Sequence, residues 1–433
     1  MATAADRTGP PGREADAGHD DDGRDRRLEP AEWRALTILG LPTFALALAI
    51  TTVTTYLPVI ASGFAASTVV IGVLIGGEGL LALALPITVG TWSERLHTRI
   101  GGRLPFVLGA TPPLVLALAV LGFAGSILTA AVVVALFFVA YYIAYEPYRA
   151  LYPDMVDDEI AARAQSTQAL FRGAATCLAL VGGGLLLAIA QPVPFLVAAA
   201  ITALSMVVFA RTLLRRGVPD QERADRDETP RATMRALRDA IAEAPALKGY
   251  LVANALWELS LGALKTFVVL YITRGLGFSM ESASLIIGLG ALVVLAGSPV
   301  SGKLADRMGR ARVMHLALWI YGIGLLVPLV TQSTLVLALA IPLVAFGGGV
   351  IMTLPYALLI PLMPKGRNGA LSGFYSLSRG IGTALGPALA GVAISLGKEP
   401  FASTQGYAAM WAVCAVAILA SIPLVRRLRD DVD

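Results

Sequence analysis

Three ionisable residues stand inside long apolar runs of the sequence: Glu78, Glu258 and Lys265. A charged side chain costs at least about 2.5 kcal/mol at the centre of a bilayer, so each is a candidate functional group. Glu258 and Lys265 are seven residues apart and therefore share one face of a helix, two turns from each other. We expect Glu258 to be a titratable site, and Lys265 either to pair with Glu78 or to bind a polar ligand. A fixed structural salt bridge is the alternative.

The fourth apolar run ends in a cluster of tyrosines. Tyr141, Tyr145 and Tyr148 lie on one helical face because they are spaced by four and three residues, and Glu146 lies among them. Aromatic rings stack on the C–H faces of sugar rings, while hydroxyl groups hydrogen-bond at the rim. We place Tyr141, Tyr145, Glu146 and Trp257 in the same ligand site as the three charges. For tyrosine and tryptophan near a helix end, an anchor at the membrane interface is the alternative.

The elements that must position these groups are membrane-spanning helices. The chain has 433 residues, of which 56% are hydrophobic and 15% charged, and its mean hydropathy is +0.71. Because unpaired backbone groups in hydrocarbon cost several kcal/mol each, apolar runs of ~20 residues must be helical. The expected fold class is an all-α integral membrane protein with two six-helix bundles. The twelve expected spans are residues 33–60, 68–89, 105–125, 127–148, 164–190, 194–210, 249–273, 283–301, 313–330, 334–356, 370–396 and 407–425.

The polar segments between the spans predict the orientation and the domain boundaries. Lys and Arg cluster in every second gap, whereas the other gaps contain only Arg274 and Lys398. The positive-inside rule then places both termini in the cytoplasm, for a multi-pass protein of the cell (inner) membrane. Within the linker, Met234 to Leu247 form either a surface amphipathic helix or plain linker. The expected segments are a disordered cytoplasmic tail at 1–32, bundles at 33–210 and 249–425, a cytoplasmic linker at 211–248 and a cytoplasmic tail at 426–433.

Three stretches of the first half recur in the second half at nearly the same offset. A repeated loop, a repeated Pro-Tyr stretch and a repeated Arg-Gly pair share a period of about 210 residues. Two homologous halves are the simplest explanation. The paired stretches are Gly90 to Arg95 with Gly302 to Arg307, Pro147 to Met155 with Pro355 to Met363, and Arg172-Gly173 with Arg379-Gly380.

Twelve spans in two halves, with Gly302-x-Leu304-Ala305-Asp306-Arg307-x-Gly309-Arg310 between the eighth and ninth, resemble the major facilitator superfamily. Pro147-x-Arg149-Ala150-Leu151-x-x-Asp154 is similar to the branch of sucrose:proton and glycoside-pentoside-hexuronide symporters. The resemblance implies two bundles that rock about a central site. It also implies that the acid of each loop motif contacts the opposite half, Glu94 towards the eleventh helix and Asp306 towards the fifth.

We expect these acids to form a cytoplasmic gate with two arginines. Arg172 and Arg379 occupy equivalent places in the fifth and eleventh spans, so the expected contacts are Glu94 with Arg379 and Asp306 with Arg172. Charge-assisted contacts of this kind can form in one state and break in another. Structural capping of the loops is the alternative. The gate candidates are Glu94, Arg95, Arg149, Asp154, Arg172, Asp306, Arg307, Arg310 and Arg379.

Secondary active transport is the expected function. The sequence lacks the Gly-x-x-x-x-Gly-Lys-Ser/Thr motif, which leaves a primary pump unsupported. We expect proton-coupled symport of a small polar solute, a sugar or glycoside, with sodium as the alternative ion. The rivals are an exporter of a drug or amphipathic metabolite and a receptor or scaffold without substrate. We expect no enzyme, cofactor, metal site or nucleic-acid partner, with Cys177 and Cys414 as buried side chains, and a monomer in the lipid bilayer.

Overall fold

The computed structural model describes residues 29–156, 160–216, 245–362 and 368–432, and their secondary structure is helical throughout. Twelve of the helices are long and apolar enough to cross a membrane, which confirms the expected fold class. The helices are α1 (Pro30–Gly63), α2 (Thr68–Arg95), α3 (Leu104–Leu121), α4 (Ile127–Asp154), α5 (Ala161–Ile189), α6 (Val193–Arg216), α8 (Pro245–Leu270) with the π-turn η2 (Tyr271–Gly275), α9 (Met280–Met308), α10 (Arg310–Val330), α11 (Thr334–Thr353), α12 (Pro355–Leu359), the 3₁₀ turns η3 (Ile360–Leu362) and η4 (Ala402–Thr404), α13 (Asn368–Leu396) and α14 (Ala409–Val432). The expected tail at 1–32, all but its last four residues, and most of the expected linker at 211–248 lie outside the described residues.

Local sequence signals explain where several of these helices begin and end. Ser67 and Ser279 precede α2 and α9, and each side-chain oxygen accepts a hydrogen bond at 3.3 Å from the backbone N–H three residues later. Gly309 separates α9 from α10 with a φ of +93°, a conformation that glycine adopts without steric cost. The tight turn between these two spans therefore requires glycine at position 309 of the loop motif.

Equivalent arginine contacts in the two bundles confirm the internal repeat. Arg103, at the start of α3, donates from Nη1 to the carbonyl oxygen of Ala150 in α4 at 2.8 Å. Arg310, at the start of α10, donates from Nη1 to the carbonyl oxygen of Ala357 in α12 at 3.1 Å. Both contacts join residues that are 47 positions apart. Each arginine therefore satisfies a carbonyl near the end of a neighbouring span.

Replacing Arg310 by methionine is expected to destabilise the second bundle. The change keeps an unbranched side chain but removes the donor, so a hydrogen bond from a charged group, worth roughly 1.5–3 kcal/mol, is lost. The measurement is the melting temperature of the detergent-purified protein. Lys303→Met is the matched control, because Lys303 is exposed in the last turns of α9, close to Arg310 in the sequence. Equal melting temperatures for the two variants would show that the Arg310 contact contributes little.

The most extensive contacts between the two bundles are those of α2 with α13 and of α5 with α9. At the first, a Cβ added to Gly72 would overlap the carbonyl oxygen of Pro387, and one added to Gly79 would overlap the backbone of Ala384. At the second, a Cβ on Gly184 would overlap the side chain of Ser284. Glycine at these positions lets the helix backbones approach each other. The two bundles therefore share tightly packed seams.

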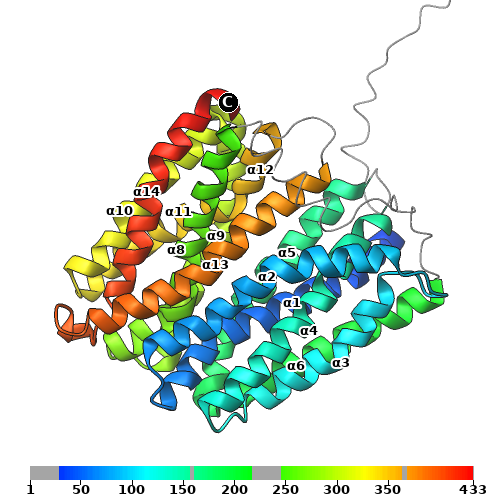
Figure 1. Cartoon of the computed structure of the whole chain (residues 1–433), viewed down its shortest axis with the longest axis horizontal. Coiled ribbons are helices and arrows are strands. Elements are labelled where there is room, and N and C mark those ends of the chain that lie inside the picture. Colours follow the sequence, from blue (N-terminus) through cyan, green and yellow to red (C-terminus); the bar gives the residue numbers. More distant parts are fainter. Residues whose placement is uncertain (1–28, 157–159, 217–244, 363–367, 433) are drawn as a thin grey trace, which may run out of the picture.

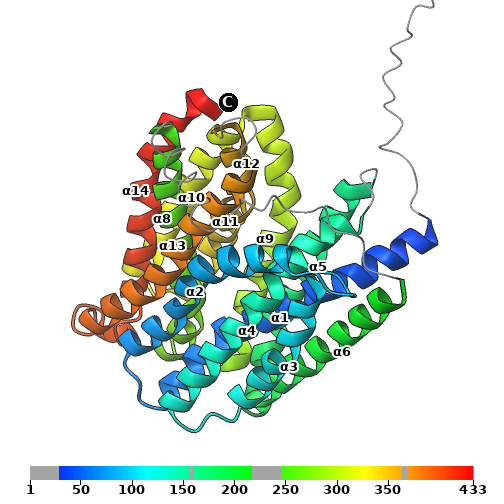
Figure 2. The ribbon, with the colours of Figure 1, turned by 45° about the vertical axis from the view of Figure 1, so that its right-hand side comes forward.

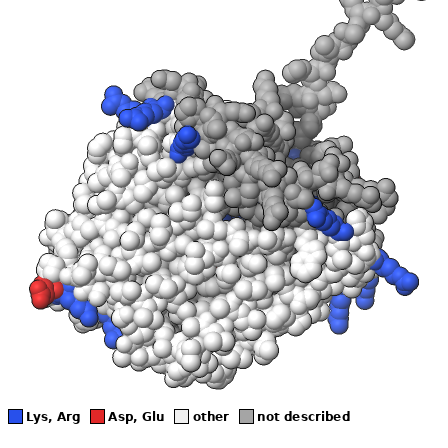
Figure 3. Space-filling model, viewed as in Figure 1, with Lys and Arg blue, Asp and Glu red and all other residues white. Residues whose placement is uncertain are grey.

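The bundles meet at one end of the molecule and diverge towards the other (Figures 1 and 2). Because the number of spans is even, α1 begins and α14 ends at the same end, called here the terminal end. At the opposite end, Thr68 donates to the carbonyl oxygen of Gly391 at 2.8 Å, and Arg274 donates to Ser62 at 3.4 Å. The face in Figure 3 carries its charged residues mainly along the margins, as expected for a surface that contacts lipid.

Candidate functional site

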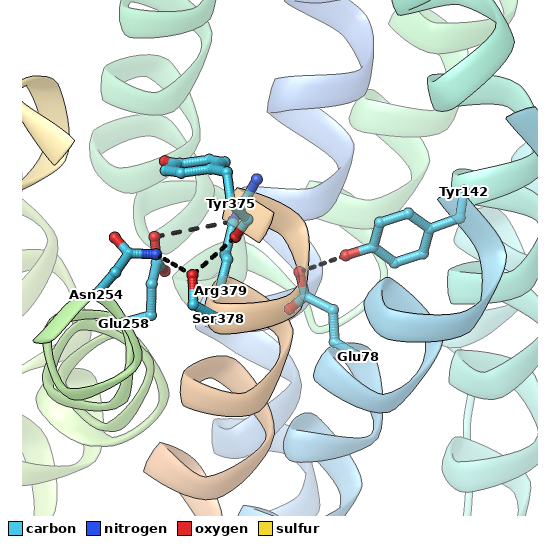
Figure 4. A network of polar contacts seen from close by, with 7 residues as sticks. All are labelled: Glu78, Tyr142, Asn254, Glu258, Tyr375, Ser378 and Arg379. Carbon is cyan, nitrogen blue, oxygen red and sulfur yellow. Dashed lines mark hydrogen bonds and ion pairs between the residues drawn. The ribbon is translucent and has the colours of Figure 1, made fainter. Parts of the chain in front are cut away.

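A network of polar side chains crosses the middle of the molecule between the bundles (Figure 4). Arg379 of α13 forms an ion pair with Glu258 of α8, with 3.9 Å between Nε and Oε1. Beside it, Asn254 of α8 donates to the hydroxyl of Ser378 at 2.7 Å, and Ser378 donates to the carbonyl oxygen of Tyr375 at 3.1 Å. These contacts hold α8 and α13 together around one charged pair.

The first bundle contributes Glu78 of α2 to the other side of this network. Glu78 is 9% exposed and accepts a hydrogen bond at 3.4 Å from the hydroxyl of Tyr142 in α4. Arg379, Lys265 and Glu258 are all near enough to act electrostatically on Glu78. Figure 4 shows Arg379 between the two carboxylates, one from each bundle. The guanidinium is therefore a shared counter-charge for Glu78 and Glu258.

Small residues of α13 make this arrangement possible. A Cβ on Gly382 would lie 2.6 Å from the Cβ of Glu258, and a Cβ on Gly380 would lie 2.6 Å from the Cγ of Leu83 in α2. Glycine thus lets α13 fit between α8 and α2 with Arg379 directed towards both carboxylates. The Arg379 side chain is nevertheless 46% exposed, compared with 16% for Glu258. A cation in the middle of a membrane span therefore keeps access to solvent between the bundles.

Of the three tyrosines predicted to share one face of α4, Tyr141 and Tyr145 lie beside the network and Tyr148 does not. Tyr141 and Tyr145 stack with ring centroids 5.4 Å apart and planes inclined by 12°. Tyr141 is buried and Tyr145 is half-buried. Both hydroxyl groups are close enough to Arg379 for an electrostatic interaction. Tyr148 points elsewhere, since its hydroxyl lies 2.7 Å from Thr43 Oγ1 and donates to a carbonyl of α1. Tyr148 is therefore a core residue of the first bundle.

Trp257 does not line the central site, and this corrects the sequence interpretation. Its side chain is 1% exposed and donates from Nε1 to Ser421 of α14 at 2.9 Å, with Tyr250 packed edge-on against the ring. Successive helix residues point about 100° apart, so the neighbour of a site residue faces elsewhere. The face of α8 that carries Trp257 packs into the second bundle.

The predicted partners of the remaining site charges are placed differently. Lys265 is exposed and forms no ion pair with a residue that the structure describes, Glu78 included. Glu146 forms an ion pair with Arg149 at 3.8 Å, one turn along α4. The sequence pattern assigns Arg149 to the gate and Glu146 to the ligand site. This ion pair therefore joins one residue from each predicted set.

The predicted ion pair of Asp306 with Arg172 is out of register in this structure, whereas the side chain of Glu94, the predicted partner of Arg379, lies outside the described residues. Gly380 packs on Leu83 of α2, and Gly173 packs in the equivalent way on Leu295 of α9. Arg379 is thus level with a position on α2 that is eleven residues before Glu94. Arg172 is level with a position on α9 that is eleven residues before Asp306. Eleven residues correspond to about 16 Å along a helix. The structure therefore puts both arginines near the middle of the spans, and Asp306 and Arg172 form no ion pair here.

The other gate candidates lie at or near the terminal end. Arg310 donates to the carbonyl oxygen of Ala357 as described above. The side chains of Glu94 and Asp154 lie outside the described part of the structure. Exposed side chains near this end are Arg95, Arg149, Asp306 and Arg307.

The predicted site did not include four polar residues of the network: Tyr142, Asn254, Ser378 and Tyr375. Asn254 stands four residues before Glu258 and therefore on the same helical face, which is a signal that would have found it. Ser378 and Tyr375 precede Arg379 but carry no comparable pattern. In the described part of the chain, no three His, Cys, Asp or Glu side chains come together as metal ligands, and Cys177 and Cys414 are free thiols.

Comparison with known sequences identifies a family match in the second half of the chain. Residues 250–432 match the sequence model of the Major Facilitator Superfamily. A segment of 101 residues is 29% identical to Multidrug resistance protein 3 of Bacillus subtilis (strain 168), covering 23% of this chain and 20% of that protein. A segment of 89 residues is 29% identical to the uncharacterized MFS-type transporter YfiU of the same organism, covering 21% of this chain and 17% of that protein. The matches thus span only about a fifth of these relatives.

Comparison with solved structures covers nearly the whole chain. A bacterial homolog of the human lysosomal transporter Spinster, in an inward-facing and occupied conformation, matches with a TM-score of 0.75 at 16% identity, over 94% of this chain and 98% of that one. The nucleoside transporter NupG matches with a TM-score of 0.70 at 13% identity, over 91% and 98%. The chain therefore has the major facilitator fold. Its membership of the superfamily is supported by the sequence match over residues 250–432, in the second bundle.

Proposed function

We propose that the protein is a secondary active transporter that couples a proton to the symport of a small polar solute, a sugar or glycoside, by alternating access. The observation that carries the proposal is the position of Arg379 between Glu258 of one bundle and Glu78 of the other. Ionisable groups inside membrane spans mark proton and substrate pathways. The protein acts as a monomer, without a cofactor, in the cell (inner) membrane.

The shared arginine supports a simple coupling mechanism. When Glu258 is ionised, it holds Arg379 within the second bundle. When Glu258 takes up a proton, this attraction is lost, and Arg379 is drawn towards Glu78 across the interface. Sodium in place of the proton would act on the same carboxylates. A proton thus changes the balance between contacts within one bundle and contacts between bundles, as a switch between two states requires.

The orientation follows from the charges of the loops. Lys and Arg cluster in the gaps at the terminal end, so we place this end in the cytoplasm. The bundles diverge towards it, which makes the conformation inward-facing. The gate forms there in the outward-facing state and includes Glu94, Arg95, Asp154, Asp306 and Arg307. On α5, Arg163 is level with Asp306 by the register set by Gly173 and Leu295, and is the proposed partner.

Proton movement into proteoliposomes tests this function. Vesicles with confirmed insertion are loaded with a fluorescent pH indicator, and monosaccharides, disaccharides and glycosides are added outside one by one. We expect acidification of the lumen with the coupled solute and with no other. An absence of response to the whole panel would contradict sugar symport. Movement of an amphipathic drug against its gradient would then support the exporter.

Glu258→Gln is expected to uncouple the solute from the proton. Glutamine has nearly the shape of the protonated acid, so Arg379 remains free to interact with Glu78. Uphill accumulation should therefore disappear, while exchange of labelled for unlabelled solute continues. The two assays are run on the same vesicles, with Glu399→Gln as the control because Glu399 is exposed beyond α13. Accumulation at the wild-type level would exclude Glu258 as the proton site.

A further inference from the structure

The charges of the central site are unevenly exposed. The carboxylates are enclosed, with Glu78 at 9% exposure and Glu258 at 16%, whereas Arg379 is 46% exposed. Arg172 and Lys265 are also exposed, and neither forms an ion pair with a residue that the structure describes. A solute that enters between the bundles therefore meets cations before it meets carboxylates.

Arg172 faces the centre of the molecule and not the lipid. The exposed leucines of α5, Leu170, Leu178 and Leu185, mark the side of this helix that contacts lipid. Arg172 follows Leu170 by two residues and so points about 200° away from it. It is also near enough to act electrostatically on Tyr141 of the first bundle and Tyr375 of the second. Arg172 and Arg379 thus approach the same space from equivalent positions in the two bundles.

Among the described residues of the site, the charges outside ion pairs are mainly positive. Arg379 is paired with Glu258, and Glu146 with Arg149. Arg172 and Lys265 form no ion pair with a described residue, and Glu78 is the carboxylate left beside them. Two cations thus face one carboxylate in an environment where unpaired charge is costly. An anionic ligand would supply the missing charge.

We infer that the central site takes a solute with an anionic group, a carboxylate or a phosphate, bound by Arg172, while Lys265 adds to the positive potential of the site. Arg379 is held by Glu258, which leaves Arg172 as the arginine available for two parallel hydrogen bonds to such a group. The inference deepens the proposed function and rests on it. A monoanion would neutralise the site by itself, and a dianion would do so together with a proton on Glu258 or Glu78.

Binding to the purified protein tests the inference separately from transport. The probes are matched pairs, D-glucose with D-gluconate and glycerol with glycerol 3-phosphate, and the readout is the shift in melting temperature as each probe is titrated. We expect the wild type to prefer the anionic member of a pair. Arg172→Gln and Lys265→Gln should weaken that binding about tenfold or more and leave the neutral member unaffected. Arg172→Lys should give an intermediate affinity, because it keeps the charge but loses the fork of donors.

The possible outcomes separate the inference from the proposed function. Arg312→Gln, at the start of α10 and outside the site, is the control for loss of a surface charge. If no anionic probe is preferred, or if Arg172→Gln weakens neutral and anionic probes equally, the inference is overturned. If an anionic probe binds through Arg172 but moves no protons in proteoliposomes, the inference holds and the coupling mechanism fails. If a neutral sugar drives proton influx and Arg172→Gln leaves that influx unchanged, the coupling mechanism holds and the inference fails.

Discussion

Arg379→Gln is expected to reduce transport about 100-fold, a change that corresponds to roughly 2.7 kcal/mol in the rate-limiting step. The variant removes the cation that Glu258 and Glu78 share, so both carboxylates lose their main compensation at once. Exchange should fall together with accumulation, because the site itself is damaged. This outcome differs from that of Glu258→Gln, where exchange is retained.

Stability measurements distinguish the ion pair from the transport role of Arg379. Breaking a fully buried pair costs 3–5 kcal/mol, and we expect about 1–3 kcal/mol here because the guanidinium is 46% exposed. The double variant Arg379→Gln/Glu258→Gln leaves no charge unpaired between these two positions, so its melting temperature should recover while transport stays lost. Lys398→Gln, an exposed change in the loop after α13, serves as the control. Wild-type transport by Arg379→Gln would contradict the mechanism.

Gly79→Ala is expected to be the most damaging change that adds a single carbon atom. The new Cβ would overlap the backbone nitrogen of Ala384 and lie 2.5 Å from the carbonyl oxygen of Gly380. Backbone atoms of a packed helix cannot move aside as a flexible side chain can. Alanine favours helix over glycine by roughly 1 kcal/mol, so any loss comes from the α2–α13 contact. We expect transport to fall about tenfold or more, since any separation of these helices displaces Arg379.

Gly77→Ala provides a matched control two residues away. No atom lies within 4 Å of the position that its Cβ would occupy, so this change should leave transport within about twofold of wild type. Spin labels at the ends of α2 and α13 opposite to the terminal end report the separation of the bundles. We expect a longer distance in Gly79→Ala and no change in Gly77→Ala. Equal distances in both variants would show that the seam tolerates the added carbon.

The twelve spans, the repeat and the rarity of charge within the spans can be read from the sequence alone. Hydrophobic runs of bilayer length admit only helices, and the repeated Arg-Gly and Pro-Tyr stretches report a duplication directly. The sequence also placed Glu258 and Lys265 on one face of α8, because the helical period is local information. These features depend only on residues that are near each other in the chain.

Which charges meet depends on how the helices pack against one another. The partner of Arg379 depends on how far α13 is shifted along α8 and α2, and that register is set by glycines packing on helices more than 100 residues away. Periodicity gives the face and the depth of a residue within its own helix, but not its level relative to another helix. For this reason the sequence pattern assigns Arg379 to the gate although its ion-pair partner is Glu258, and assigns Trp257 to the site although it lies in the core.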